Sequence, residues 1–107
     1  MAEDAEFNRL VDKVFNRIEN DIDALQADID VNISGNILYI EFLDQSEIII
    51  SRQISSHEIW IAAKSGGYRL SIGSAQEWRC TSSKEYLPTL LSRLITEQSG
   101  FEVKMLN

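Results

Sequence analysis

The sequence predicts an α+β fold, a two-layer α/β sandwich in which two helices pack on one face of an antiparallel sheet of about six strands. Helical apolar periodicity occupies residues 3–25 and again the segment before Gly100, and between them apolar and polar residues alternate in short segments separated by turns. Because each element has one apolar face, two helices on one side of the sheet bury all these faces together. The 107 residues fit one domain, 1–107.

The first helix is predicted by an apolar stripe with three- and four-residue steps. Its members are Phe7, Leu10, Val11, Val14, Phe15, Ile18, Ile22 and Leu25. On one side of the stripe lies an acidic edge, consisting of Asp4, Asn8, Asp12, Glu19 and Asp23. On the other side lies a basic edge, consisting of Arg9, Lys13 and Arg17. Asp4 is also a candidate N-cap.

The acidity of the chain is regional. Residues 3–30 hold nine of the 17 acidic side chains and three basic ones, so this stretch carries −6 of the net charge of −7. A solvated helix face is the ordinary interpretation. However, Glu19 and Asp23 form a like-charge pair that costs a helix about 0.2–0.5 kcal/mol, and a cation or basic partner would relieve it. Leu25 and Gln26 exclude an EF-hand loop, so any metal site is an open surface one.

The predicted strands cover residues 28–33, 37–42, 47–53, 58–63, 68–72 and 77–81. In the first of them, Ile29, Val31 and Ile33 are expected on the inner face. Gly35 can take the positive φ that the following hairpin turn requires. The β-branched run at 48–50 predicts that the third strand is central.

Serines and a proline mark the start of the second helix. Ser82 and Ser83 are candidate N-caps. Because Pro88 is tolerated only in a first turn, the predicted start moves toward Lys84 or Glu85.

The rest of that helix carries a second apolar stripe, which consists of Leu87, Leu90, Leu91, Leu94 and Ile95. Gly100 is placed to end the helix in a left-handed conformation. Phe101 and Val103 are expected to fold back onto the core.

The face of the sheet without helices should be open to solvent. Trp60 is expected there, whereas Trp78 and Cys80 are expected to point inward. The other side chains expected on the open face are Arg52, Arg69 and Arg79. A tryptophan exposed among arginines suggests a protein-binding surface.

Composition narrows the class of partner. A net charge of −7 disfavours nucleic acids and anionic membranes and leaves cations or basic proteins. The acidic start is unlike a targeting segment, and no run of about 18 apolar residues occurs, so we expect a soluble protein of the cytoplasm. The single cysteine excludes a disulfide or a multi-cysteine metal site within one chain.

Catalytic motifs are few. His57 has Ser55 and Ser56 beside it in sequence, but nothing indicates a triad, so a hydrolase is not predicted. His57 is either an ordinary loop histidine or an accessory ligand for iron, cobalt or zinc. Cys80 could pair with His57 as a thiol dyad, but the strand face that it shares with Trp78 favours a buried structural thiol. No phosphate-binding glycine loop is present.

The acidic first helix and five short motifs together resemble the bacterial frataxin family. The motifs are DIDV at 28–31, ISRQ at 50–53, HEIWIA at 57–62, SGGY at 65–68 and EWRC at 77–80. The resemblance covers nearly the whole chain, and it implies a frataxin-like fold.

The resemblance further implies an iron-binding protein of iron–sulfur cluster assembly that is not an enzyme. It would hold ferrous or ferric iron weakly at its surface, with other divalent or trivalent cations able to substitute. The implied metal ligands are Glu3, Asp4, Glu19, Asp23, Asp28, Asp30 and His57. The implied partner-binding residues are Glu19, Asp23, Asp28, Asp30, Arg52 and Trp60. Asn8, Asn20 and Ala24 depart from the histidine and acids of relatives, so the acidic surface should be sparser here.

The implied partners are a cysteine desulfurase and the iron–sulfur scaffold machinery, and the implied state is a monomer with metal-dependent oligomers. Two other functions stay open. One is a metal-independent acidic adaptor. The other is a ferroxidase, which ranks last because the Glu-x-x-His ligation of such enzymes is absent from the sequence.

Overall fold

The computed structural model describes residues 2–100 and 102–105, which form a helix, six strands and a second helix. The elements are α1 (Ala2–Leu25), β1 (Asp30–Ser34), β2 (Ile37–Glu41), β3 (Glu47–Gln53), β4 (Glu58–Ala63), β5 (Gly66–Ile72), β6 (Trp78–Cys80) and α2 (Leu87–Ser99). The predicted two-layer α+β sandwich is therefore confirmed. Neither helix is long and apolar enough to cross a membrane within the described residues.

The six strands form one antiparallel sheet in sequence order, β1-β2-β3-β4-β5-β6. The register places Leu38 beside Ile50 and Ile50 beside Ile61, and all three side chains are buried. Because side chains alternate along a strand, Trp60 and its neighbours Ser51 and Arg69 point to the opposite face. The sheet thus has one core face and one open face.

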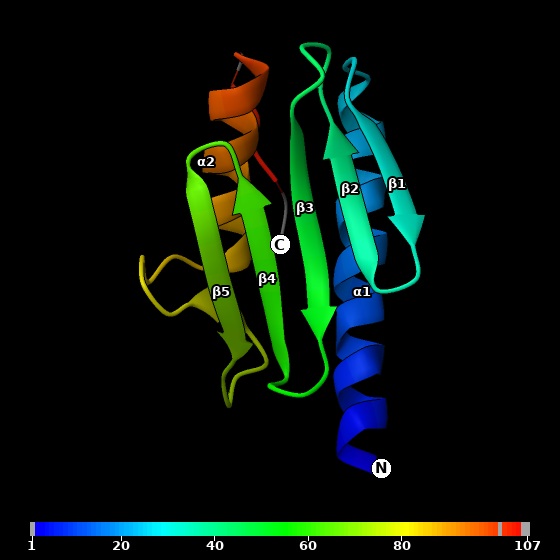
Figure 1. Ribbon diagram of the computed structural model, residues 1–107, viewed down its shortest axis with the longest axis vertical. Helices are drawn as coiled ribbons and strands as arrows, with labels where there is room; N and C mark the ends of the chain where they lie inside the picture. Colours follow the sequence, from blue (N-terminus) through cyan, green and yellow to red (C-terminus); the bar gives the residue numbers. More distant parts are fainter. Residues whose placement is uncertain (1, 101, 106–107) are drawn as a thin grey trace.

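Both helices cover the same face of the sheet. Figure 1 shows them behind it, with α1 on the side of β1, β2 and β3 and α2 behind β4 and β5. Most of the apolar stripe of α1 is buried: Phe7, Val11, Phe15, Ile18 and Ile22. Leu10, Val14 and Leu25 are only partly buried. The stripe of α2 is buried completely.

The helix starts differ from the prediction. Asp4 is not an N-cap, because α1 already includes Ala2. Ser82 and Ser83 do not cap α2 either, since its N-cap is Tyr86 and Pro88 lies in its first turn. The serines instead belong to a turn after β6.

That turn is held by backbone hydrogen bonds. Lys84 N donates to Cys80 O at 3.1 Å, and Cys80 N donates to Glu85 O at 2.8 Å. The chain is therefore tied to the edge strand until just before Pro88, and α2 begins only at Leu87.

The predicted end of α2 is confirmed. Gly100 has a φ of 82°, and its N–H donates to Thr96 O at 3.1 Å. Val103 and Met105 fold back and are buried. Phe101 lies outside the described residues.

The first strand departs from the prediction at its far end. Ile29 is buried and Val31 is half-buried, but Ile33 is 41% exposed. The reason is that β1 is an edge strand with a neighbour on one side only. Gly35, with a φ of 59°, forms the predicted hairpin turn to β2.

Candidate functional site

Asp4 and His57, two predicted metal ligands, are in contact although 53 residues separate them. His57 Nε2 donates a hydrogen bond to Asp4 Oδ1 at 2.8 Å, and the two side chains are 38% and 44% exposed. The imidazole also stacks on Phe7, with ring centroids 4.9 Å apart. His57 has a φ of 54° in the turn between β3 and β4. This contact joins that turn to the first turns of α1.

Asp4 and His57 together present an oxygen and a nitrogen ligand at the surface. Glu3 is exposed beside them in the first turn of α1. Among the described residues, however, no three His, Cys, Asp or Glu side chains are grouped so that they could hold one metal ion. An ion bound here would complete its coordination with water and would compete with the hydrogen bond from His57.

The other four predicted ligands lie at the far end of α1 and at the start of β1. We call Glu19, Asp23, Asp28 and Asp30 the distal acids. Glu19 is half-buried and the other three are exposed. The helix and β1 are in contact, and Figure 1 shows them side by side.

The distal acids differ from Asp4 and Asp12 in having no paired cation or imidazole in the described part of the chain. None of them forms an ion pair there. The structure thus brings them to one region as an open anionic surface. Across residues 2–100 and 102–105 it does not arrange them as an enclosed centre.

Arg52 corrects the prediction for the open face. It shares its strand face with Ile48 and Ile50, and its side chain, only 10% exposed, points toward α1. Arg52 Nη2 donates to Asp12 Oδ1 at 2.7 Å, and Nη1 donates to Asn8 Oδ1 at 3.0 Å. The expected display of Arg52 on the open face is therefore wrong.

The surroundings of Arg52 explain why a cation is tolerated there. Its guanidinium lies 5.1 Å from the ring centroid of Phe15, a cation–π contact. Only its Nε is buried without a hydrogen-bond partner within the described residues. The Asp12 carboxylate, 62% exposed, supplies the opposite charge while remaining hydrated.

Trp60 points to the open face, as predicted, but it is half-buried where exposure was expected. Arg69 lies 4.5 Å from the centroid of its indole ring. Trp60 Nε1 donates to Glu58 Oε1 at 2.8 Å, and this hydrogen bond holds the pKa of Glu58 below its usual value despite partial burial. Arg79 is exposed and lies over Tyr86. The indole is thus held by Glu58 on its own strand and by Arg69 on β5.

Cys80 is buried, as predicted, with 1% of its surface exposed. Desolvation raises the pKa of its thiol, but hydrogen bonds with Ser82 and Ser83 outweigh it and lower the pKa to about 7. The thiol lies 3.4 Å from Ser82 Oγ. His57 is engaged with Asp4 and Phe7, so the structure gives no support to a Cys80–His57 dyad.

Sequence reasoning missed two features of this surface. The first is the inward position of Arg52, which strict alternation with Ile48 and Ile50 would have indicated. The second is the contact between Asp4 and His57, for which no sequence signal exists because it depends on how α1 crosses the sheet. The distal acids, in contrast, were predicted from the regional charge of residues 3–30 together with the family resemblance.

Comparison with known proteins identifies the family. The frataxin-like domain matches residues 1–101. The chain is 42% identical to a Photobacterium profundum protein over 94% of both chains, and 47% identical to a Vibrio cholerae protein over 84% of this chain and 86% of that one. Both relatives are named iron-sulfur cluster assembly protein CyaY.

A solved structure of a frataxin supports the same family assignment. The frataxin from Psychromonas ingrahamii superposes with a TM-score of 0.90 at 31% identity, over 97% of this chain and 98% of that one. Fold and sequence lead to the same assignment, and the chain belongs to the frataxin-like CyaY family.

Proposed function

We propose that this chain is an iron-binding protein of iron–sulfur cluster assembly that docks on a cysteine desulfurase and modulates its delivery of sulfur. The observation that carries the proposal is the anionic surface formed by the distal acids, in a chain whose relatives are named for cluster assembly. The role is that of a regulator, not an enzyme. The expected compartment is the cytoplasm.

The chemistry of this surface suits iron as a cargo that is held weakly. Carboxylate oxygens are hard ligands, which suit ferric and ferrous ions as well as other divalent or trivalent cations. Since no three acidic or imidazole groups surround one position in the described residues, water must supply most of the coordination. Asp4 and His57 form a second, separate place for an ion.

A titration with cobalt(II), followed by NMR, tests cation binding. Paramagnetic broadening should affect amides of residues 3–30 and His57 first. The matched control replaces the distal acids by Gln or Asn, which should remove the broadening near Asp28 and leave that near Asp4. Broadening confined to α2 would contradict cation binding at either place.

A desulfurase assay tests the proposed function itself. The protein is added to the cysteine desulfurase and scaffold with and without ferrous iron. We expect the protein to change the rate of sulfide release or cluster formation, and iron to alter the size of that change. No effect in either condition would contradict the proposal.

One observation supports a second candidate function, that of a metal-independent adaptor protein. Within the described residues the distal acids lack the three-ligand grouping of an enclosed metal centre, yet as exposed negative charge they suit a basic partner. In that case the rate change would be identical with and without iron.

A further inference from the structure

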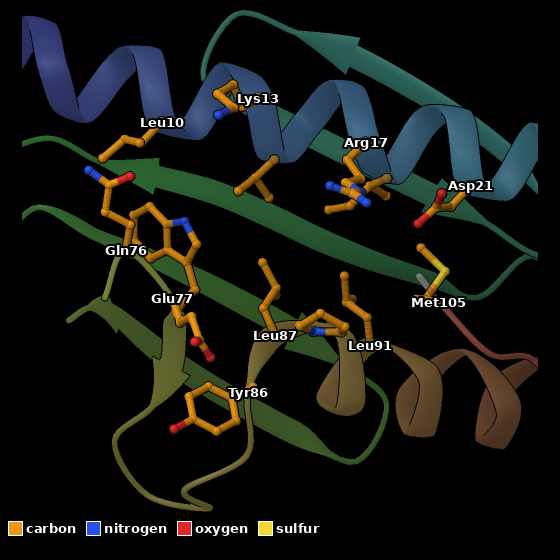
Figure 2. Close-up of a pocket in the computed structure, with 14 residues that line it drawn as sticks. Leu10, Lys13, Arg17, Asp21, Gln76, Glu77, Tyr86, Leu87, Leu91 and Met105 are labelled. Atoms are coloured by element: carbon orange, nitrogen blue, oxygen red, sulfur yellow. The ribbon is translucent and has the colours of Figure 1, made fainter. Parts of the chain in front are cut away.

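A groove on the helix side of the molecule is separate from the acidic surface. Its volume is about 470 Å³, and it lies between α1, α2 and the segment around β6. Figure 2 shows α1 along one wall, Leu87 and Leu91 of α2 on the other, and Met105 near one end. This volume falls within the range of about 300–1,000 Å³ that is typical of small-molecule sites.

The apolar wall exists because the fold leaves part of α1 uncovered. Leu10 and Val14 belong to the apolar stripe of α1 but are only partly buried, and both line the groove. The late start of α2 at Leu87 limits how far it can cover them. Apolar surface that faces water in a groove favours an apolar ligand.

Two cations stand on the same wall. Lys13 and Arg17 are exposed and line the groove, and neither forms an ion pair with another residue in the described ranges. Asp21 and Glu77 also line it, so among the described residues the lining has no net formal charge although the chain carries −7. An anion in this groove is therefore repelled less by the negative charge of the protein than it would be elsewhere on the surface.

We infer that this groove binds a free amphipathic anion, a medium-chain aliphatic carboxylate. The alkyl chain lies along Leu10, Val14 and Leu87, and the carboxylate lies at Lys13 and Arg17. An anionic membrane surface is disfavoured as the source of the ligand because the rest of the chain would be repelled by it. The groove covers one side of a ligand, so the binding is modest in strength.

Decanoate below its micelle-forming concentration is the probe. In the variant Trp60→Phe, the remaining tryptophan, Trp78, lines the groove and reports binding by its fluorescence. We expect saturable binding that tightens by up to about fourfold for each methylene added from octanoate to decanoate. Decanol should bind more weakly, and decylamine weakest of all. Equal binding of the three head groups would overturn the assignment to an anion.

Two matched variants locate the head group. Lys13→Gln combined with Arg17→Gln should weaken decanoate binding about fivefold, the effect of losing exposed charge pairs. Arg9→Gln removes a cation from the same helix that pairs with Glu6 and does not line the groove, and it should change the affinity by less than about twofold.

Three further results would overturn the inference. One is the absence of saturable binding by the folded protein. Another is an equal loss of affinity in the Arg9→Gln variant and in the double variant. The third is binding to anionic phospholipid vesicles without any binding of free decanoate. All of these readouts are independent of desulfurase activity.

Discussion

The acidic edge of α1 has two halves with different surroundings. In the N-terminal half, Asp4 accepts a hydrogen bond from His57 and Asp12 pairs with Arg52. In the C-terminal half, Glu19 and Asp23 form no ion pair within the described residues. The carboxylates of the N-terminal half therefore attach α1 to the sheet. Those of the C-terminal half leave their negative charge available to a cation or a basic partner.

This difference has an energetic meaning. An anchored carboxylate stabilises the fold through a charge-assisted hydrogen bond. Unpaired carboxylates repel one another, which slightly lowers the free energy of unfolding. A bound cation or basic partner relieves this repulsion and raises the free energy of unfolding again. Removing a side chain that attaches α1 to the sheet should therefore lower the free energy of unfolding. Neutralising the distal acids should instead weaken the proposed binding to the cysteine desulfurase.

The largest expected change comes from Arg52→Met. It removes two hydrogen bonds to α1 and the contact with Phe15 while keeping an apolar side chain of similar length. We expect the free energy of unfolding, measured with urea, to fall by about 2–3 kcal/mol.

The matched control is Arg69→Met, on the open face. Because Arg69 is exposed and its cation–π contact with Trp60 is worth about 0.5–1 kcal/mol, its replacement should lower the free energy of unfolding by less than about 1 kcal/mol. Equal losses in the two variants would refute the anchoring role of Arg52.

A smaller loss is expected for His57→Asn. Asparagine tolerates the positive φ of this position, so the change isolates the contacts with Asp4 and Phe7 from backbone strain. The free energy of unfolding should fall by about 1 kcal/mol. In the variant Asp4→Asn the stacking on Phe7 persists, and the loss should be smaller. An unchanged stability in His57→Asn would show that the contact is not an anchor.

Glu85 extends the comparison to the other helix. Arg93 donates two hydrogen bonds to its carboxylate, at 2.8 and 3.0 Å, and holds the pKa of Glu85 below its ordinary value of 4.5. A lowered pKa in the folded state contributes stability above pH 4.5, and that contribution is lost as the pH falls through the folded value.

Acid titration of stability tests this anchor. We compare the free energy of unfolding at neutral pH with that at the lowest pH at which the protein stays folded. It should fall by up to about 1 kcal/mol more for the wild-type protein than for Glu85→Gln. Parallel pH profiles for the two proteins would mean that Arg93 does not stabilise the Glu85 carboxylate.

The smallest change in stability is expected when all four distal acids are neutralised as Glu19→Gln, Asp23→Asn, Asp28→Asn and Asp30→Asn. The fold should be unchanged or more stable by up to about 0.5 kcal/mol, because self-repulsion is relieved. Binding to the cysteine desulfurase should weaken and lose most of its dependence on salt, which screens charges beyond about 10 Å at 0.1 M.

A binding titration at several salt concentrations distinguishes the outcomes. If the quadruple variant binds like the wild type at every concentration, the distal acids do not form the docking surface. If it binds weakly but unfolds at much lower urea concentration, these acids are anchors like Asp12, and the comparison between the two halves fails.

Local sequence patterns predicted the structure correctly where the geometry of a single helix or strand decides which side chains are buried. The ranges of β3 and β4 were predicted to the residue, and the apolar stripe of α2 is buried as expected. The opposite directions of Trp60 and Trp78 also followed from alternation. Helix starts were harder, because the turn that holds Ser82 and Ser83 is tied to β6 by backbone hydrogen bonds.

The sequence by itself therefore determined the two-layer sandwich, the order of helices and strands along the chain and the acidity of residues 3–30. The reason is that apolar periodicity and charge are properties of consecutive residues. The tertiary structure alone decided that Arg52 pairs with Asp12 and that His57 meets Asp4, across 40 and 53 residues. Those contacts, and the groove between the helices, depend on where α1 and α2 settle on the sheet, which packing of the whole core sets.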